Sequence, residues 1–483
     1  MDTAAAIPPG TTTDGASATT DRTGLLTRAR GLRGPLLDPY RLALVLFVLY
    51  ATLSVCRYRR MATMSWDLGI FEQAIRAYAH FQEPIADLKG PGANILGDHF
   101  SPITALLGPV YRIFPGPMTL LVAQAALFAL SAVPVTRVAA RLLGRGRGLA
   151  IGIAYGASWG VQRAVDFDFH EICFAVPLLA FALEAVLRER WYAAMLWAAP
   201  LVLVKEDMGA TVAAIGAVIV IRTWKTHEPR ITSLAVGLMV FGVMASAIAL
   251  GVIIPGFNGT GGYDYWEKVG GGGEQTGSIP LGTALRTLLW MLLPTTGLLA
   301  LRSPLLLVAG PTLGWRFLSH DDHYWGTDWH YSAVLMPVVF LALVDAVDRT
   351  RDSRRAWLAS YSRQLPAAVC GAALALSSSM PLYDLTKEAT YRKPAEVGAV
   401  ERLLGRIPDG ASVEANVGPI ARLTERCRVL WVGAAGGVEP DYIALQEPER
   451  SMSEVVAYAR QLHPGATYEP FGTASGYYVV KRR

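Results

Sequence analysis

The sequence predicts a mainly α-helical membrane protein with about eleven transmembrane helices and a small α/β domain at its C-terminal end. Two observations point to this fold class. Hydrophobic residues make up 52% of the 483 residues and charged residues only 17%, proportions that are typical of membrane proteins. Long apolar segments also alternate with short polar loops as far as residue 382, beyond which the composition becomes mixed.

The segment 1–39 is rich in Ala, Thr, Gly and Pro and lacks the layout of a secretory signal, so we expect a disordered cytoplasmic tail. The membrane domain is expected over 40–382, because a transmembrane helix needs roughly 20 mostly apolar residues. Segments that approach this length are 40–56, 118–138, 148–165, 172–187, 191–204, 208–221, 231–254, 283–301, 303–318, 331–347 and 364–381.

Basic residues set the expected orientation of these segments. Arg28, Arg30, Arg33 and Arg41 precede the first segment, which places the N-terminus in the cytoplasm because cytoplasmic loops carry an excess of Lys and Arg. With alternating spans, every later basic cluster except Arg57–Arg60 falls on the same side. The acidic and histidine-rich loops fall on the extracytoplasmic side.

Two regions decide how often the chain crosses the membrane. His99–Pro117 contains four prolines and only short apolar runs, which favours a helix on the outer surface over a span. One helix over 191–221 would place Lys205, Glu206 and Asp207 near the bilayer centre, at roughly 2.5–3.5 kcal/mol each. We therefore predict two helices joined by a tight turn at this tripeptide.

The segment 383–483 is expected to form a small extracytoplasmic α/β domain, because helices alternate with short apolar strands. The expected elements are a helix at 400–407, strands at 411–415, 428–433 and 441–446, a helix at 453–462 and a hairpin at 468–481. The net charge of +5 comes with no basic, aromatic-rich face, so no nucleic-acid partner is expected. The four cysteines show no metal-ligand spacing, which argues against structural zinc.

Most acids and histidines next to the apolar segments fall into seven short stretches: 66–67, 98–99, 166–171, 205–207, 263–267, 320–323 and 328–330. Ionisable groups beside hydrocarbon are costly and usually serve a function, so we expect these stretches to line one extracytoplasmic chamber. The fifth stretch, with Glu267, continues into Gly270–Gly273. We interpret this run as a hinge in an outer loop, because no P-loop lysine follows it.

The first two stretches each allow two interpretations. Asp67 precedes an amphipathic helix that it could cap, with Glu72 and Arg76 paired on a solvated face. Alternatively, Asp67 is a catalytic carboxylate. Asp98 and His99 begin the surface segment, either as a cap or as substrate-binding groups.

The loop 163–171 carries Asp166, Asp168 and His170 between aromatic residues. In an extended segment the three polar groups share one face, and in a helix Asp166 pairs with His170. Such a group could hold a divalent cation or transfer protons, with the aspartates binding substrate and His170 acting in catalysis. The alternative is a hydrated loop with aromatic anchors.

The tripeptide 205–207 is either an internally neutralised turn or part of the site. In the second case Lys205 binds a phosphate, Glu206 acts in catalysis as base or metal ligand, and Asp207 contacts the substrate.

The loop 319–331 is the densest polar cluster. We expect His320, His323, Tyr324 and Trp325 to line a sugar or lipid-phosphate pocket. The histidine spacing matches no recognised zinc motif.

Four motifs carry a family resemblance: Trp66-Asp67-Leu-Gly-Ile-Phe-Glu-Gln, Gly97-Asp98-His-Phe-Ser-Pro, Asp168-Phe-His-Glu and Val204-Lys-Glu-Asp. In this order they resemble an uncharacterised prokaryotic membrane-protein family, domain of unknown function 2079 (DUF2079), over most of the membrane region. The layout is in turn similar to the GT-C class of integral-membrane glycosyltransferases. This resemblance implies that Asp67 is the first-loop base or acceptor-orienting carboxylate, and that His99-Phe-Ser-Pro102 enters the surface helices.

The resemblance also implies an activity. GT-C enzymes transfer a sugar from a polyprenyl-phosphate donor, which leads us to expect such a donor and an envelope glycan or glycoprotein acceptor outside the cytoplasm. A divalent cation is the one cofactor left open, because the first loop lacks the tandem Asp-Asp signature of some members. Two alternatives remain, a transporter or flippase and a non-catalytic envelope-assembly protein.

Overall fold

The computed structural model describes residues 20–266 and 277–483. The chain divides into two units, 1–38 and 39–483, and helix α1 (Thr20–Arg59) begins in the first and ends in the second. This helix therefore starts inside the segment predicted to be a disordered tail, and the prediction remains only for the residues before Thr20. The predicted hinge at Gly270–Gly273, together with Glu267, lies outside the described residues.

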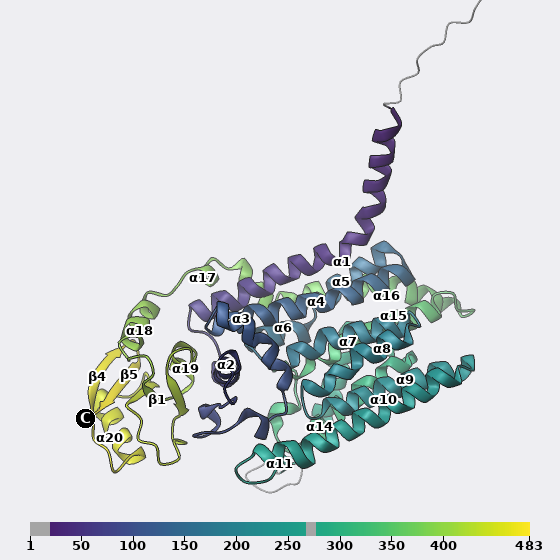
Figure 1. Cartoon of the computed structure of the whole chain (residues 1–483). Coiled ribbons are helices and arrows are strands. Elements are labelled where there is room, and N and C mark those ends of the chain that lie inside the picture. Colours follow the sequence, from purple (N-terminus) through teal and green to yellow (C-terminus); the bar gives the residue numbers. More distant parts are fainter. Residues whose placement is uncertain (1–19, 267–276) are drawn as a thin grey trace, which may run out of the picture. The chain divides into compact units, whose positions relative to one another are not determined.

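The apolar helices that come after α1 in the sequence pack together as a bundle (Figure 1). They are α4 (Pro117–Leu143), α5 (Arg145–Gly156), α6 (Trp159–Asp166), α7 (Ile172–Leu187), α8 (Trp191–Ala198), α9 (Met208–Thr226), α10 (Pro229–Ile248), α11 (Ile254–Phe257), α13 (Leu281–Thr296), α14 (Gly310–Leu318), α15 (Leu335–Thr350) and α16 (Ala356–Ser377). Each predicted spanning segment falls mainly on helical residues, although several are interrupted.

Four segments of the described chain are long and apolar enough to cross a membrane: Leu36–Arg59, Pro117–Leu143, Pro229–Phe257 and His330–Thr350. Shorter apolar helices accompany them at Ile172–Leu187, Trp191–Leu203 and Met208–Trp224. The bundle is thus built from membrane-compatible helices, while the number of eleven spans stays a prediction.

Helix α15 forms the centre of the bundle. In the apolar segment His330–Thr350, which contains α15, 94% of the most apolar 18-residue stretch is buried inside the protein. Helix α15 packs against α4, α7 and α13. A helix that is apolar on all sides belongs in the interior. Its buried acid Asp345 lies 2.7 Å from Arg222 of α9 and 3.0 Å from Arg349, so the buried charge is paired.

The region 191–226 folds as the predicted pair of helices. Helix α8 continues as a 3-10 turn to Leu203, and α9 begins at Met208 after a break. Helix α9 packs closely on α10, since a Cβ added to Gly209 would lie 2.1 Å from the carbonyl oxygen of Gly242. Two glycines let the backbones touch, which fixes the end of α9 that follows the Lys-Glu-Asp tripeptide.

Between α1 and α4 the chain forms short elements only. Helix α2 (Trp66–Ala79) is followed by 3-10 turns at Ile95–Gly97 and Pro102–Leu107 and by α3 (Gly108–Ile113). The 3-10 turn Pro102–Leu107 and α3, which follows it directly, together rise only about 21 Å, less than the roughly 30 Å of a bilayer core, so the segment after His99 is too short to cross a bilayer. This agrees with the surface location predicted from its prolines.

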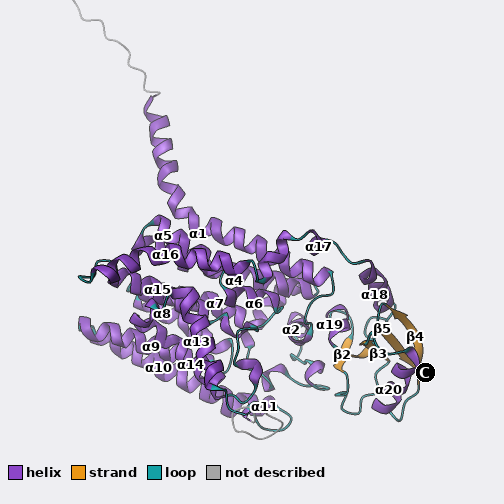
Figure 2. Cartoon of the chain, turned by 180° about the vertical axis from the view of Figure 1, so that it is seen from behind, coloured by secondary structure: helices purple, strands orange, loops and turns teal. Residues whose placement is uncertain are grey.

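The C-terminal part forms one five-stranded sheet, drawn in orange in Figure 2. The strands are β1 (Ser412–Ala415), β2 (Arg428–Trp431), β3 (Tyr442–Gln446), β4 (Tyr468–Ala474) and β5 (Tyr477–Arg482). Their order is β2-β1-β3-β5-β4, with β2, β1 and β3 parallel and β5 antiparallel to both neighbours.

Four helices accompany the sheet: α17 (Glu388–Tyr391), α18 (Ala395–Gly405), α19 (Val417–Leu423) and α20 (Met452–Leu462). Alternate side chains of a strand point to opposite faces. On β3, Ala444 joins a core with α18 and α19, and Ile443 joins a core with α20. The predicted sheet and its two flanking helices are present, and α19 is an additional helix.

The C-terminal domain is joined to α2 by buried polar contacts. Glu72 of α2 is fully buried and accepts hydrogen bonds from Tyr111 of α3 and from Thr424, which follows α19. Arg76, one turn later, donates to the carbonyl oxygen of Thr424 at 2.6 Å. The predicted Glu72–Arg76 pair on a solvated face is therefore wrong, because α2 turns this face toward the C-terminal domain.

Candidate functional site

Five residues from four of the polar stretches approach one another at one end of the bundle. Asp67 lies beside His170, Glu206 beside His99, and Lys205 beside the acid that follows His170. We call these five residues the polar site. Stretches that are far apart in the sequence thus meet, as the chamber hypothesis requires.

Asp67 lies in the first turn of α2 and is half-buried. The helix begins at Trp66, and its N-cap is Ser65, so the interpretation of Asp67 as a cap is wrong. Its carboxylate makes no hydrogen bond or ion pair within the described chain, and burial raises its pKa although His170 acts in the opposite direction. Such a carboxylate is suited to accept a proton.

Strained backbone fixes the position of this turn. Ser65 has a φ of 61° and Asp168 a φ of 82°, a region that L-residues rarely adopt. The Ser65 N–H donates to Oδ2 of Asp168 at 3.0 Å, and Asp168 is 3% exposed. The buried carboxylate of Asp168 therefore holds the start of α2, and with it Asp67.

The polar groups between α6 and α7 diverge. Asp166 forms an ion pair with Arg57 at 2.7 Å, Asp168 faces the start of α2, and only His170 faces the polar site. The prediction that the three share one face is wrong, because the left-handed backbone at Asp168 turns the chain between them. Gln124 of α4 holds this turn: it accepts from the His170 N–H at 3.0 Å and donates to the Asp168 carbonyl.

Lys205 is paired outside its own tripeptide. Its Nζ lies 3.4 Å from Oε1 of Glu171, and Oε2 of Glu171 lies 2.7 Å from Nδ1 of His170. Burial opposes a charge on Lys205, but Glu171 and neighbouring acids raise its pKa above the usual value. The interpretation of the tripeptide 205–207 as an internally neutralised turn is therefore wrong. Glu171 holds the charged Lys205 close to His170.

Glu206 is surrounded by donors. Oε1 accepts from Tyr263 at 2.7 Å and lies 2.9 Å from Nδ1 of His99, and Oε2 accepts from the Phe100 N–H at 3.1 Å. Burial would raise the pKa of Glu206, but His99 and the hydrogen bonds lower it to about 2. A weakly basic carboxylate with both oxygens occupied is a poor general base, so its surroundings assign Glu206 to positioning His99 and Tyr263.

A cavity of about 240 Å³ opens beside Lys205. His99 and the aromatic side chains of Tyr263, Trp315 and Tyr324 line it, and Asp207 also contributes. Burial raises the pKa of Asp207 to about 6. The cavity thus combines a cation with aromatic walls.

A second, more polar cavity of about 440 Å³ lies next to the first, and Tyr265 lines both. Its polar groups include Lys89, Asp98, Asn258 and Asp264. Asp98 lies 3.0 Å from Nζ of Lys89, so its carboxylate is used in an ion pair and does not cap the surface segment.

The loop 319–331 contributes to the polar site only in part. Tyr324 lines the cavity beside Lys205, whereas the side chain of His323 is 64% exposed and lies 2.9 Å from Asp321. Trp325 is buried and donates to the Ser319 carbonyl at 2.7 Å, so it holds the loop. His320 is half-buried and lines neither cavity.

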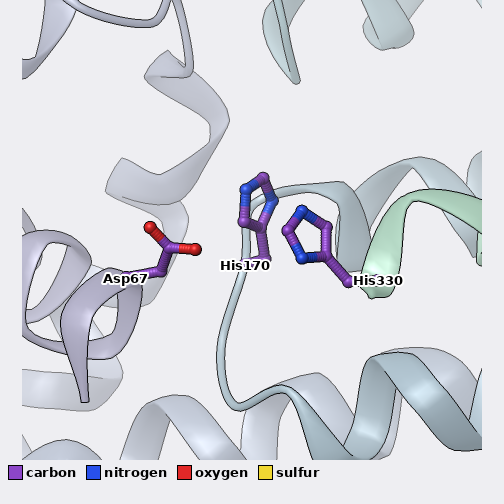
Figure 3. A group of neighbouring side chains, drawn as sticks. All are labelled: Asp67, His170 and His330. Carbon is purple, nitrogen blue, oxygen red and sulfur yellow. The ribbon is translucent and has the colours of Figure 1, made fainter. Parts of the chain in front are cut away.

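His330 belongs to the stretch 328–330 that was expected to line the chamber, but no individual role was predicted for it. In Figure 3 the carboxylate of Asp67 points toward His170, whose ring lies between Asp67 and His330. One ligand-type atom of each residue lies within 4.8 Å of the others. The available signal was the position of His330, directly before a predicted span. Imidazole and carboxylate groups are metal ligands, so this group could hold a cation.

The arrangement offers two chemical capabilities, which Glu171 and His170 connect. The charged Lys205 can bind an anion against aromatic walls, and Asp67 can accept a proton from a hydroxyl group. These are the requirements of a group transfer from a phosphate-bearing substrate.

Comparison with known proteins agrees with this architecture. The crystal structure of ArnT from Cupriavidus metallidurans bound to undecaprenyl phosphate is similar with a TM-score of 0.55 and 13% identity, over 90% of this chain and 97% of that chain. The apo structure of the same protein gives 0.52 and 14% identity, over 86% and 93%. The chain therefore has the fold of ArnT, in agreement with the predicted GT-C-like architecture.

Sequence comparison gives the family. A search of curated proteins finds no match. The family model described as "Predicted membrane protein (DUF2079)" matches residues 57–269 and 274–475. Because these ranges cover most of the chain, the protein belongs to the DUF2079 family of membrane proteins.

Proposed function

We propose that the protein is a GT-C-type glycosyltransferase that transfers a sugar from a polyprenyl-phosphate donor to an acceptor in the cell envelope. The observation that carries this proposal is the charged Lys205 at an aromatic cavity, 3.4 Å from Glu171, whose other oxygen lies 2.7 Å from His170, the neighbour of Asp67. A phosphate needs a cation, and a polyprenyl chain needs an apolar wall. The fold of a protein crystallised with undecaprenyl phosphate adds support.

Each group has a stated role in the transfer. Lys205 binds the donor phosphate, and Glu171 sustains its charge. Asp67 takes the proton of the acceptor hydroxyl while that oxygen attacks the anomeric carbon of the sugar. The bond from this carbon to the phosphate oxygen breaks, and the polyprenyl phosphate leaves with the electron pair beside Lys205. The cavity at Asp98 receives the acceptor.

The transfer takes place outside the cytoplasm in this proposal. The bias of basic residues places the N-terminus inside, and the polar site and the C-terminal domain on the opposite side. Envelope glycans and glycoproteins are the acceptors that such a site can reach.

Binding and transfer are tested separately with the full chain in lipid nanodiscs. Native mass spectrometry with undecaprenyl phosphate should show binding that Lys205→Met weakens at least about 10-fold, because the phosphate loses its cation. Transfer from a radiolabelled polyprenyl-phosphate sugar should fall at least about 100-fold in Asp67→Asn, with lipid binding retained. The control is Asp352→Asn, at an exposed acid beyond the far end of α15, which should match the wild type.

Two results would contradict the proposal. Wild-type transfer rates in Asp67→Asn would remove the base, and a wild-type protein that binds no undecaprenyl phosphate would remove the donor class. Movement of the labelled lipid across a vesicle without chemical transfer would instead support the transporter alternative.

A further inference from the structure

Three potential metal ligands converge beside the polar site from separate elements. Asp67 comes from the first turn of α2, His170 from the loop before α7, and His330 from the turn that leads into α15. One ligand-type atom of each lies within 4.8 Å of the other two. Metal–ligand bonds of about 2.0–2.2 Å place two ligand atoms of one ion at most about 4.4 Å apart, so small side-chain shifts would bring these three atoms to one ion.

His330 is the observation that points to a bound ion. Its side chain is 2% exposed, and neither ring nitrogen has a hydrogen-bond partner within the described chain. A buried polar group without a partner costs about 1–3 kcal/mol and needs an explanation. The ring stacks on that of His170, with 3.9 Å between the centroids and 30° between the planes, so the two imidazoles are neighbours.

His170 has a carboxylate beside the ring nitrogen that the ion would not use. Its Nδ1 lies 2.7 Å from Oε2 of Glu171, whose side chain is fully buried, although this contact lacks the angle of a hydrogen bond. Histidines that bind a metal usually donate their second nitrogen to a carboxylate, and a small turn of the ring would complete this bond. Nε2 of His170 would then face the ion. The N–H of His170 is held by Gln124 at 3.0 Å, so the backbone is fixed as well.

We propose that Asp67, His170 and His330 bind one divalent transition-metal ion, such as Zn²⁺ or Mn²⁺. Two imidazoles and one carboxylate suit such ions, whereas Mg²⁺ and Ca²⁺ prefer oxygen ligands only. Three protein ligands leave coordination positions open to water or substrate. Binding of the ion is independent of the proposed transfer. Its role rests on that proposed function: one carboxylate oxygen of Asp67 would hold the ion, and the other would take the proton of an acceptor hydroxyl oriented by the ion.

The exposed trio Asp321, Asp322 and His323 provides a matched control. These residues also bring three ligand-type atoms within 4.8 Å of one another, but they lie on one loop, where water satisfies them. A metal bound by the protein can therefore be assigned to one group or the other by substitution.

The experiment uses the purified full chain in detergent, stripped with a chelator and then titrated with Zn²⁺ alone. The wild type should retain one equivalent after dialysis, measured by mass spectrometry of the metal. His330→Ala and Asp67→Asn should weaken binding at least about 10-fold, and His323→Ala should bind as the wild type does. No retained metal, or metal lost in His323→Ala and kept in His330→Ala, would overturn the proposal.

A second measurement needs no variant and covers the case in which a substitution prevents folding. Mn²⁺ bound to the wild-type chain should show coupling to imidazole nitrogens in pulsed electron paramagnetic resonance, and a spectrum without nitrogen coupling would overturn the proposal. The proposed metal site and the proposed transferase function can be refuted independently of each other. Transfer that persists in full after the metal is removed would deny the ion its role, and metal binding without transfer would leave the site in place without the enzyme.

Discussion

At the scale of single residues, the sequence indicated which groups carry charge but not which groups they meet. Asp67, His99, His170 and Lys205 were predicted site residues, and the structure brings them together. Glu171 lies in the stretch 166–171 but received no role of its own, because its role depends on Lys205, a residue of another loop. Contacts between loops arise only from the packing of the helices that carry them, so local spacing could not reveal these pairs.

Glu72 illustrates the same point and gives a prediction about pH. Burial raises its pKa to about 8, against the usual 4.5, although hydrogen bonds from Thr424 and Tyr111 act in the opposite direction. Between these pH values the folded state holds a proton that the unfolded state has lost. Stability should therefore fall as pH rises through this window, by at most roughly 1.4 kcal/mol per pH unit from this group.

Thermal unfolding of the purified protein between about pH 5 and pH 8 measures this slope. Glu72→Gln should reduce it, because the amide does not ionise, whereas Glu449→Gln at an exposed acid should leave it unchanged. An equal slope in the wild type and in Glu72→Gln would show that another group controls the pH dependence.

At the scale of elements, apolar periodicity was a reliable guide. The predicted helices are present, and in the C-terminal domain the predicted strands lie within a few residues of those observed. The helix α19 was not predicted, because Val417–Leu423 is short and contains both glycine and proline. The turn at Asp168 was not predicted either, because a non-glycine residue in a left-handed conformation leaves no mark in the sequence.

The contact between α9 and α10 predicts that two glycine-to-alanine substitutions change the stability of the protein in opposite directions. In Gly209→Ala the new methyl group meets the Gly242 carbonyl, and the overpacking should cost about 1–3 kcal/mol. In Gly237→Ala on α10 the methyl group enters open space, so the higher helix propensity of alanine should stabilise by up to about 1 kcal/mol. Thermal unfolding in one detergent compares the two. Equal shifts would mean that α9 and α10 are not in close contact.

At the scale of the whole molecule, charge is distributed between the two ends of the bundle. The polar site gathers at the end where α15 begins, and the arginine-rich loop 349–355 follows the other end of the same helix. The sequence predicted this division from the positive-inside rule. It could not predict that the C-terminal domain contacts α2, because this contact depends on the tertiary placement of Thr424.

Cysteine labelling tests the orientation. In a background without Cys56, Cys173, Cys370 and Cys427, a membrane-impermeant maleimide applied to intact cells should label His323→Cys. Arg354→Cys, at an exposed position in the opposite loop, should react only after the cells are permeabilised. The reverse pattern would place the polar site in the cytoplasm and rule out an extracytoplasmic acceptor.

The hydrogen bond between Glu72 and Thr424 joins residues 352 positions apart, and this separation has a consequence for biosynthesis. The helix that presents Asp67 leaves the ribosome well before the segment that secures it, because Thr424 follows Glu72 by 352 positions. A nascent or truncated copy therefore lacks the support of its own active carboxylate. Under the proposed function, a chain in synthesis would become competent for transfer only after the segment with Thr424 has been made and has folded against α2.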